Sequence, residues 1–245
     1  MRHIIAISGG KDSAALALYM RGRLPSVEYI FCDTGAELPE LYEFLERLEC
    51  VLGQEIVRLT DTTKAHPARR DIFYYIDRWD FLPTAVDRWC TKHLKIRPFE
   101  RYIKRQVGPA TVYIAFRSDE QRKGNYGLDA NIEYRYPFVE DGIDFAGVMQ
   151  ILKDNEIELP AFYAWRSTGG CWLCPFQRRS DWQALKRHHP ALFQRAKKLE
   201  QKHQHQWNQL YTLEEIEAQR DLPMNIEERD LDEFEEGMPC AICAK

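Results

Sequence analysis

Short apolar runs alternate with amphipathic stretches through the first third of the chain, and this alternation limits the possible folds more than any other feature of the sequence. The apolar runs, typical of buried strands, occupy residues 4–7, 27–31 and 55–59. The stretches between them, 14–20 and 38–52, have helical spacing. Strands that alternate with helices in this way predict a parallel sheet with right-handed crossover connections.

The helix expected at 38–52 has apolar residues at three- and four-residue steps, as one helix face requires. These residues are Leu38, Leu41, Phe44, Leu45, Leu48 and Leu52. The run 110–115 predicts a fourth strand, reached through a helix around 94–104. Three later helices are expected: 145–155, 180–185 capped by Ser180, and 189–207. We therefore predict an α/β fold, with an open, mostly parallel sheet, helices on both of its faces, and a small helical, cysteine-bearing C-terminal part.

The most informative motif is the loop between the first predicted strand and the helix that follows it. Its residues are Ser8, Gly9, Gly10, Lys11, Asp12 and Ser13. A glycine-rich turn at the carboxyl end of a parallel strand directs backbone N–H groups and the helix dipole at a bound phosphate. Lys11 adds a cation, the two serines add hydroxyls, and Asp12 can hold the Mg²⁺ that a bound pyrophosphate needs.

Two more charged residues come directly after predicted strands. Asp33 follows the second strand and Arg117 follows the strand at 110–115. Because the carboxyl ends of parallel strands meet at one edge of the sheet, both should line the same crevice as the loop. A carboxylate there can meet a ribose hydroxyl or Mg²⁺, and a guanidinium can grip a phosphate. The alternative for each is a surface ion pair.

The loop resembles the pyrophosphate-binding loop of the ATP pyrophosphatase (PP-loop) superfamily. Three further segments are similar to the phosphoadenylylsulfate (PAPS) reductase branch of that superfamily. They are 32–40 with its Asp-Thr-Gly, 88–98 with Arg-Trp-Cys-Thr-Lys, and 117–120 with Arg-Ser-Asp-Glu. The resemblance extends over residues 1 to 205. It implies an adenine nucleotide α-hydrolase-like fold, ATP and Mg²⁺ as ligands, and catalytic roles for Lys11, Asp12 and Arg117.

Cysteine spacing points to a second kind of chemistry. Cys171 and Cys174 form a Cys-x-x-Cys in a loop bounded by glycine and proline, and two such thiolates can reach one metal or one cluster. The resemblance adds Cys90 as a third ligand, although Trp89 replaces one cysteine of the family's pair. The fourth ligand would come from the C-terminal pair, Cys240 or Cys243, with Cys243 preferred; an exogenous group or the absence of a fourth ligand are the alternatives. We expect a [4Fe-4S] cluster; structural zinc and metal-free redox or persulfide-carrying thiols are the alternatives.

Cys32 and Cys50 lie in strand-end and helix patterns and are expected to be packing residues. The resemblance further implies three parts: a PP-loop nucleotide-binding domain at 1–140, a helical Cys-x-x-Cys substrate and cluster region at 141–210, and an acidic tail at 211–245. The sequence has no apolar run of transmembrane length and starts in a strand-like pattern instead of a signal core. We therefore expect a cytoplasmic protein without a membrane partner.

The net charge of -4 argues against indiscriminate nucleic-acid binding, but it hides an asymmetry. Eight Lys or Arg residues lie between 177 and 205, whereas eleven acids lie between 214 and 236. The basic segment fits a track for a phosphate backbone. The plainer interpretation is two solvated helix faces of opposite sign.

The ATP-using form of the loop separates this chain from PAPS reductases proper, whose loop is modified and whose C-terminal nucleophile segment is missing here. The resemblance is greatest to the ATP pyrophosphatases of bacterial DNA phosphorothioation systems (DndC and SspD type), which help to exchange a backbone oxygen for sulfur. It implies DNA, a cysteine desulfurase or other sulfur donor, and other modification-complex subunits as partners, with a homodimer as a further expectation. PAPS or APS reduction and tRNA thiolation are the alternatives, and a non-catalytic nucleotide-binding subunit is a third.

Overall fold

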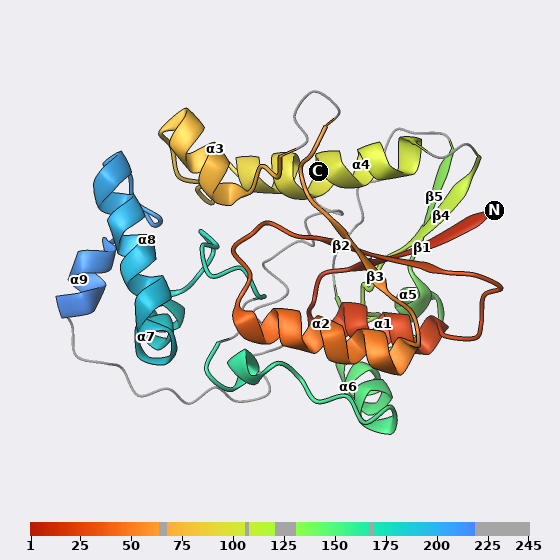
Figure 1. The fold of residues 1–245 in the computed structure, drawn as a ribbon. Helices are drawn as coiled ribbons and strands as arrows, with labels where there is room; N and C mark the ends of the chain where they lie inside the picture. The colour runs from red at the N-terminus through yellow and green to blue at the C-terminus, as the bar shows by residue number, and fades with distance from the viewer. Residues whose placement is uncertain (64–67, 106–107, 121–130, 167–168, 219–245) are drawn as a thin grey trace.

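A computed structural model describes residues 1–63, 68–105, 108–120, 131–166 and 169–218. Its centre is a five-stranded sheet in which all neighbouring strands are parallel, in the order β3-β2-β1-β4-β5 (Figure 1). The strands are β1 (Arg2–Ile7), β2 (Glu28–Cys32), β3 (Ile56–Leu59), β4 (Ala110–Tyr113) and β5 (Ile132–Arg135). The predicted parallel α/β sheet is confirmed, and β5 is an additional edge strand.

Strand β1 occupies the middle of the sheet and pairs with β2 on one side and β4 on the other. The chain passes from β1 to β2 and β3 on one side, and reaches β4 and β5 on the other. Such a reversal of strand order leaves a crevice at the carboxyl ends, where ligands bind in open α/β sheets. The loop after β1 lies at this reversal.

Helices cover both faces of the sheet, as the sequence predicts (Figure 1). One face carries α1 (Lys11–Met20), α2 (Pro39–Leu52) and α6 (Phe145–Asp154); the other carries α4 (Arg97–Lys104). Helix α3 (Ile72–Trp79) and the π-helix η1 (Thr91–Ile96) lie toward the sheet edge at which the strands end, and their buried residues Ile72, Ile76 and Leu94 join the core on the α1 side. Successive strand residues face opposite sides, so Ile5 joins the core with α1 and α2 while Ile4 joins the core with α4. Both isoleucines are fully buried, as expected in a parallel sheet covered on both faces.

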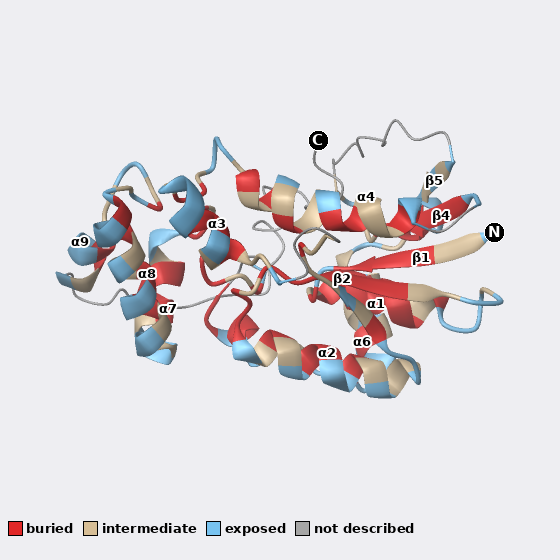
Figure 2. Cartoon of the chain, turned by 45° about the horizontal axis from the view of Figure 1, so that its top comes forward, coloured by how far each residue is buried: buried red, intermediate tan, exposed pale blue. Residues whose placement is uncertain are grey.

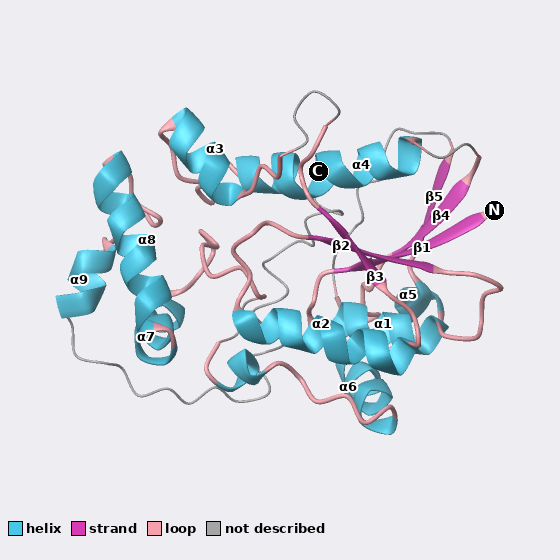
Figure 3. Cartoon of the chain, in the orientation of Figure 1, coloured by secondary structure: helices cyan, strands magenta, loops and turns pink. Residues whose placement is uncertain are grey.

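The C-terminal part is helical and lies beyond the sheet edge at which the strands end (Figure 3). Its helices are α7 (Arg179–His188), α8 (Pro190–His203) and α9 (Leu213–Ala218); the short elements α5 (Pro137–Glu140) and η2 (Ala161–Ala164) precede it. Trp172, Trp182 and Phe193 join the core on the α1 side of the sheet. Figure 2 shows buried segments along the strands and along the inner sides of the helices.

Several local predictions need correction. Ser180 does not cap a helix, because α7 begins at Arg179 and the Asp181 carboxylate accepts the Arg178 N–H at 3.0 Å. The predicted helix at 94–104 is a π-helix followed by α4, and α8 ends at His203 instead of 207. Cys50 is exposed on α2, so it is not a packing residue, whereas Cys32 is buried as predicted. Helix α3 was not predicted.

Within the described ranges, no helix has the length and apolar character needed to cross a bilayer. Helix α6 packs against α1, which links residues after 140 to the sheet. The division into parts at 1–140, 141–210 and 211–245 stays a prediction, and most of the acidic tail lies outside the described residues.

Candidate nucleotide site and cysteine loop

The loop between β1 and α1 is held open by internal hydrogen bonds. The Ser8 N–H donates to Ser13 Oγ at 3.0 Å, and Ser13 Oγ donates to the Gly10 carbonyl at 3.0 Å. Gly9 has a φ of +80°, and a Cβ at this position would lie 2.7 Å from Leu41 Cδ1. The positive φ favours glycine at this position, and a larger residue would also force the Leu41 side chain to move. The loop ends at the N-terminus of α1, as expected for an anion site.

Lys11, Asp12 and Arg117 form a buried charged group at the ends of β1 and β4. The Arg117 guanidinium lies 3.5 Å from Asp12 Oδ1, and Lys11 Nζ lies 3.8 Å from Asp12 Oδ2. Lys11 and Arg117 are both fully buried, and the Phe145 ring faces both cations, at 5.5 Å and 5.4 Å. The structure thus brings together the three residues predicted to be catalytic.

The electrostatics keep Arg117 charged. Burial acts to lower the pKa of Arg117, but the carboxylates of Asp12, Asp119 and Glu120 raise it, and the net shift is upward. Asp119 accepts from Arg117 Nε at 3.0 Å. A guanidinium that stays protonated with one face toward Asp12 can stabilise charge on a transferring phosphoryl group.

Asp33 lies at the same sheet edge, directly after β2, and is nearly buried. Its Oδ1 accepts from the Gly35 N–H and from the Tyr42 hydroxyl, both at 2.8 Å. Arg69 makes an ion pair with it at 3.0 Å. Burial and the hydrogen bond to Asp33 raise the pKa of Tyr42. Asp33 is therefore a fixed acceptor directly after β2, the strand that neighbours β1.

The loop containing Cys171 and Cys174 packs onto the segment that follows Asp33. The Leu38 N–H donates to the Gly170 carbonyl at 2.7 Å, and the Trp172 N–H donates to the Ala36 carbonyl at 2.9 Å. Buried Arg166 donates to the Cys171 carbonyl at 2.7 Å. The Cys-x-x-Cys and the nucleotide crevice are thus neighbouring parts of one region.

Cys90, Cys171 and Cys174 share an environment that disfavours thiolates. Burial raises the pKa of all three thiols, that of Cys90 to about 11, and the Cys174 sulfur raises the pKa of the other two further. Lys95 acts against this shift at each sulfur. Cys90 directly precedes the π-helix η1, an irregularity that is frequent at functional sites.

The structure describes three of the four predicted metal ligands, Cys90, Cys171 and Cys174. Among the residues placed by the structure, no group of three or more His, Cys, Asp or Glu side chains has a geometry that would hold a metal ion. The fourth predicted ligand, Cys243, lies outside the described residues. The described cysteines therefore do not by themselves fit a closed metal site.

The structure adds residues that the sequence motifs did not single out. The Tyr163 hydroxyl accepts the Lys11 N–H at 3.3 Å, and the Tyr163 ring lies 6.0 Å from Lys11 Nζ. Glu37 is buried, accepts from Thr34 at 2.8 Å and has its pKa raised by burial. Tyr163 is remote from Lys11 in sequence, so no local pattern could identify it. Glu37 lies inside the Asp-Thr-Gly segment, which was the available signal.

Comparisons with known proteins agree with this architecture. The crystal structure of phosphoadenylyl-sulfate (PAPS) reductase from Candida auris, a phosphate complex, is similar with a TM-score of 0.54 at 17% identity. The match covers 70% of this chain and 82% of that one. At this identity the likeness establishes the fold.

Curated relatives share the sequence at low identity. Two uncharacterized proteins of Methanocaldococcus jannaschii are 21% identical over 211 residues and 22% identical over 203 residues. These matches cover 77% and 78% of this chain but only 45% and 40% of the relatives. An uncharacterized nin region protein of Escherichia phage lambda is 25% identical over 147 residues, half of each chain. This chain thus spans less than half the length of the archaeal relatives.

The phosphoadenosine phosphosulfate reductase domain matches residues 2–126, more than half of the chain. This region contains β1 to β4, the loop after β1, and Asp33, Cys90 and Arg117. With the parallel sheet and the position of these residues, the match places the chain in the PAPS reductase-like branch of the PP-loop superfamily, to which it belongs.

Proposed function

We propose that this chain is an ATP pyrophosphatase that adenylylates an oxygen of a nucleic-acid substrate, so that sulfur can replace that oxygen. The observation that carries the proposal is the buried Lys11–Asp12–Arg117 group behind an N–H-rich loop. Its two cations and one carboxylate suit the transfer of a phosphoryl group from a Mg²⁺-bound nucleotide.

In the proposed reaction a substrate oxygen attacks the α-phosphorus of ATP, and the bond to the β-phosphate breaks. The loop amides at the N-terminus of α1 and the Lys11 ammonium bind the departing pyrophosphate. Arg117 stabilises charge on the transferring group. Asp12 offers a carboxylate beside them that would hold Mg²⁺, a cation that prefers oxygen ligands. Asp33 is the acceptor for a ribose hydroxyl.

The second half of the proposed reaction needs a sulfur nucleophile that displaces AMP. Cys171 and Cys174 support this part, because their loop contacts the segment after Asp33. A sulfur donor such as a cysteine desulfurase would load one of the two as a persulfide, whose outer sulfur forms the new P–S bond as the bond to AMP breaks. The other thiolate would then break the S–S bond, and an external thiol would reduce the resulting Cys171–Cys174 disulfide. The [4Fe-4S] cluster, with zinc as its alternative, remains a prediction, and no step above passes through a metal cluster.

The acceptor that we propose is a non-bridging oxygen of the DNA backbone, as in DNA phosphorothioation. The complete form of the loop supports an ATP-splitting member of the family. Reduction of PAPS or APS is the second candidate, favoured by the family match to the reductase domain. tRNA thiolation uses the same first step on a different acceptor.

The deciding experiment incubates the protein with Mg²⁺ and α-labelled ATP, with and without DNA, and separates AMP, ADP and pyrophosphate. Formation of AMP and pyrophosphate, stimulated by DNA, is the expected result. Stimulation by tRNA alone would move the acceptor to RNA. No turnover of ATP, together with release of adenosine 3′,5′-bisphosphate from PAPS and a thiol reductant, would replace the proposal with the reductase.

A further inference from the structure

We propose that a surface on α3, η1 and the first residue of α4, here called the aromatic–basic surface, binds single-stranded DNA. Its residues are Tyr74, Arg78, Trp79, Lys92, His93 and Arg97. The identity of the polymer rests on the proposed function. The surface combines part of segment 88–98 with helix α3, which the sequence did not predict.

Aromatic rings on this surface form a connected stack that reaches solvent. The Trp79 ring lies 4.5 Å from Tyr75, 5.0 Å from buried Trp89 and 4.8 Å from His93. Trp79 is nevertheless 38% exposed and Tyr74 is 40% exposed, so part of each side chain is available to a ligand. Rings fixed from behind and open in front can receive an unstacked base, because every base has a π-face.

Cations surround these rings. Arg78 is one helical turn after Tyr74 and therefore lies on the same face of α3. Arg78, Lys92 and Arg97 are all exposed, and Arg97 is 2.8 Å from His93 Nδ1. Burial, followed by the nearby Arg97 and Lys92, lowers the pKa of His93. A phosphate backbone complements this charge.

Three of the acids near the surface have hydrogen-bond or ion-pair partners within the protein. Asp77 pairs with Lys202 at 2.5 Å, and Asp80 accepts from His203 at 2.5 Å. Asp61, which faces His93 from the end of β3, is held by Arg70 and Arg101. Asp87 lies in the exposed connection before η1. Lysine or arginine thus pairs with Asp77 and Asp61.

The basic segment between residues 177 and 205, which the sequence suggested as a track for a phosphate backbone, is less available to bind DNA. Lys197 pairs with Glu217 at 2.5 Å, and Lys202 pairs with Asp77. The Arg195 guanidinium stacks on Phe73 at 3.7 Å, and that of Arg179 lies over Tyr211 at 5.6 Å. At least four of its eight cations are thus engaged with other side chains, which favours the aromatic–basic surface.

The aromatic–basic surface adjoins the candidate site. The first N–H of α3, from Ile72, donates to the Thr34 carbonyl at 3.0 Å, next to Asp33. On the same helix, Phe73 packs against Trp172 of the cysteine loop at 5.9 Å. Cys90 directly precedes η1. A strand held on the surface would therefore pass beside the crevice and the cysteines.

The test measures fluorescence anisotropy of a labelled oligodeoxythymidylate of about 12 nucleotides, a length within the usual site size. The full chain is used without ATP, so that binding is tested separately from ATP cleavage. Trp79→Leu should weaken binding about tenfold, the effect of losing one stacked base. The double variant Arg78→Glu, Lys92→Glu should weaken it at least as much and flatten its salt dependence. Trp79→Phe should restore part of the affinity.

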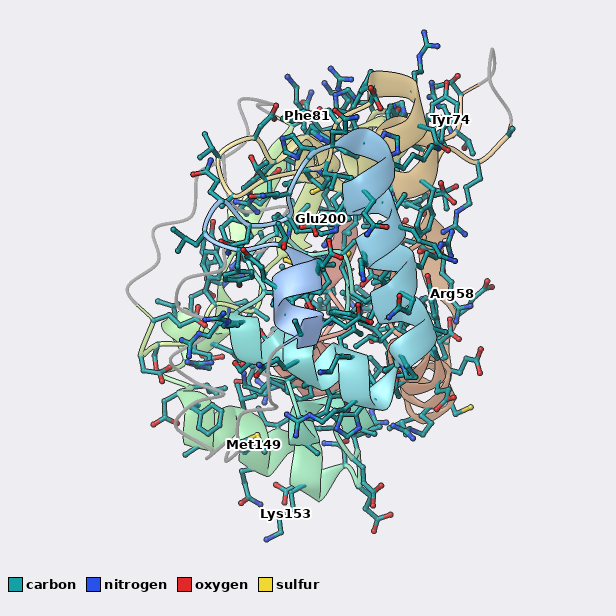
Figure 4. The ribbon with its side chains drawn as sticks, turned by 90° about the vertical axis from the view of Figure 1, so that its left-hand side faces the viewer. Arg58, Tyr74, Phe81, Met149, Lys153 and Glu200 are labelled. Atoms are coloured by element: carbon teal, nitrogen blue, oxygen red, sulfur yellow. The ribbon has the colours of Figure 1, made fainter. Side chains whose placement is uncertain are left out.

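Lys153→Glu is the matched charge reversal. Lys153 is exposed on α6, at the opposite end of the molecule from Tyr74 (Figure 4), so its reversal should leave binding unchanged. Equal binding by wild type, Trp79→Leu and the double variant would overturn the proposal, as would loss of binding in Lys153→Glu of the same size. Binding of oligouridylate but not oligodeoxythymidylate would overturn the choice of DNA. AMP formation without binding would leave the proposed function standing and remove only this surface.

Discussion

The Arg117 guanidinium lies 3.5 Å from the Asp12 carboxylate, and this pair joins the loop after β1 to the loop after β4. The two residues are remote in sequence but follow adjacent parallel strands. Arg117 is fully buried, so Asp12, Asp119 and Glu120 must balance its charge. The site is therefore a structural feature of the folded sheet as well as a candidate for chemistry.

Arg117→Met should lower the free energy of unfolding by about 3–5 kcal/mol, because it leaves buried carboxylates without their cation. Arg135→Met is the matched control, since Arg135 pairs with Glu140 at the surface, where such pairs contribute about 1 kcal/mol or less. Chemical denaturation measures both. A loss for Arg117→Met no larger than that for Arg135→Met would show that the buried group does not stabilise the fold.

Lys11→Met should reduce AMP and pyrophosphate formation by about 10²-fold or more, because a buried cation that stabilises developing phosphate charge is removed. Methionine keeps most of the buried volume, so circular dichroism should be unchanged. Lys153→Met, on exposed α6, is the control and should keep full activity. Full turnover by Lys11→Met would exclude Lys11 from the mechanism.

Gly9→Ala should destabilise the protein by more than Gly22→Ala. Both glycines have positive φ, +80° and +75°, so both substitutions carry a similar backbone cost. Only at Gly9 would the new Cβ meet Leu41, at 2.7 Å, whereas Gly22 has open space. Thermal unfolding of both variants measures the extra cost of the contact with Leu41. Equal losses of stability would mean that the Leu41 side chain moves aside without cost.

His93 should make the fold less stable in mild acid. Burial, followed by Arg97 and Lys92, lowers the pKa of His93, so in mild acid the unfolded chain binds a proton at this residue more readily than the folded chain does. The stability that neutral His93 allows is fully present above the pKa of histidine in the unfolded chain, about 6.5. It is lost as the pH falls below about 6.5 toward the lower pKa of His93 in the folded chain. His93→Asn should therefore lose less stability than wild type between about pH 7.5 and pH 5.5. Denaturant unfolding at several pH values measures the slopes, and identical slopes would contradict the assignment.

The cluster prediction can be tested by metal analysis of protein purified without oxygen. A [4Fe-4S] cluster bound by the predicted set should be lost in Cys171→Ser and diminished in Cys243→Ser, because each substitution removes one of the four predicted thiolate ligands. Cys50→Ser, at an exposed position on α2, should retain all iron. Zinc in place of iron would establish the structural-zinc alternative. Protein without either metal would leave the thiols as redox or persulfide carriers.

The order of strands and helices in the first third of the chain could be predicted because each element carries its own periodicity. The apolar runs alternate with the helix at α2, whose buried positions Leu41, Phe44, Leu45 and Leu48 match the predicted stripe. The loop after β1, Asp33 and Arg117 could be found because a residue after a strand must lie at one sheet edge. These are local signals, and the sequence alone determined them.

Only the tertiary structure determined what those residues touch. The ring of Tyr163 beside Lys11, the ion pair of Arg69 with Asp33, and the packing of Phe73 against Trp172 join segments with no shared pattern. Helix α3 escaped prediction, although its buried positions are Ile72, Tyr75 and Ile76. Its exposed Trp79 is held in place by Trp89 and His93, which come from a different segment of the chain. Periodicity specifies which side of an element is buried, whereas its partner is selected by the packing of the whole chain.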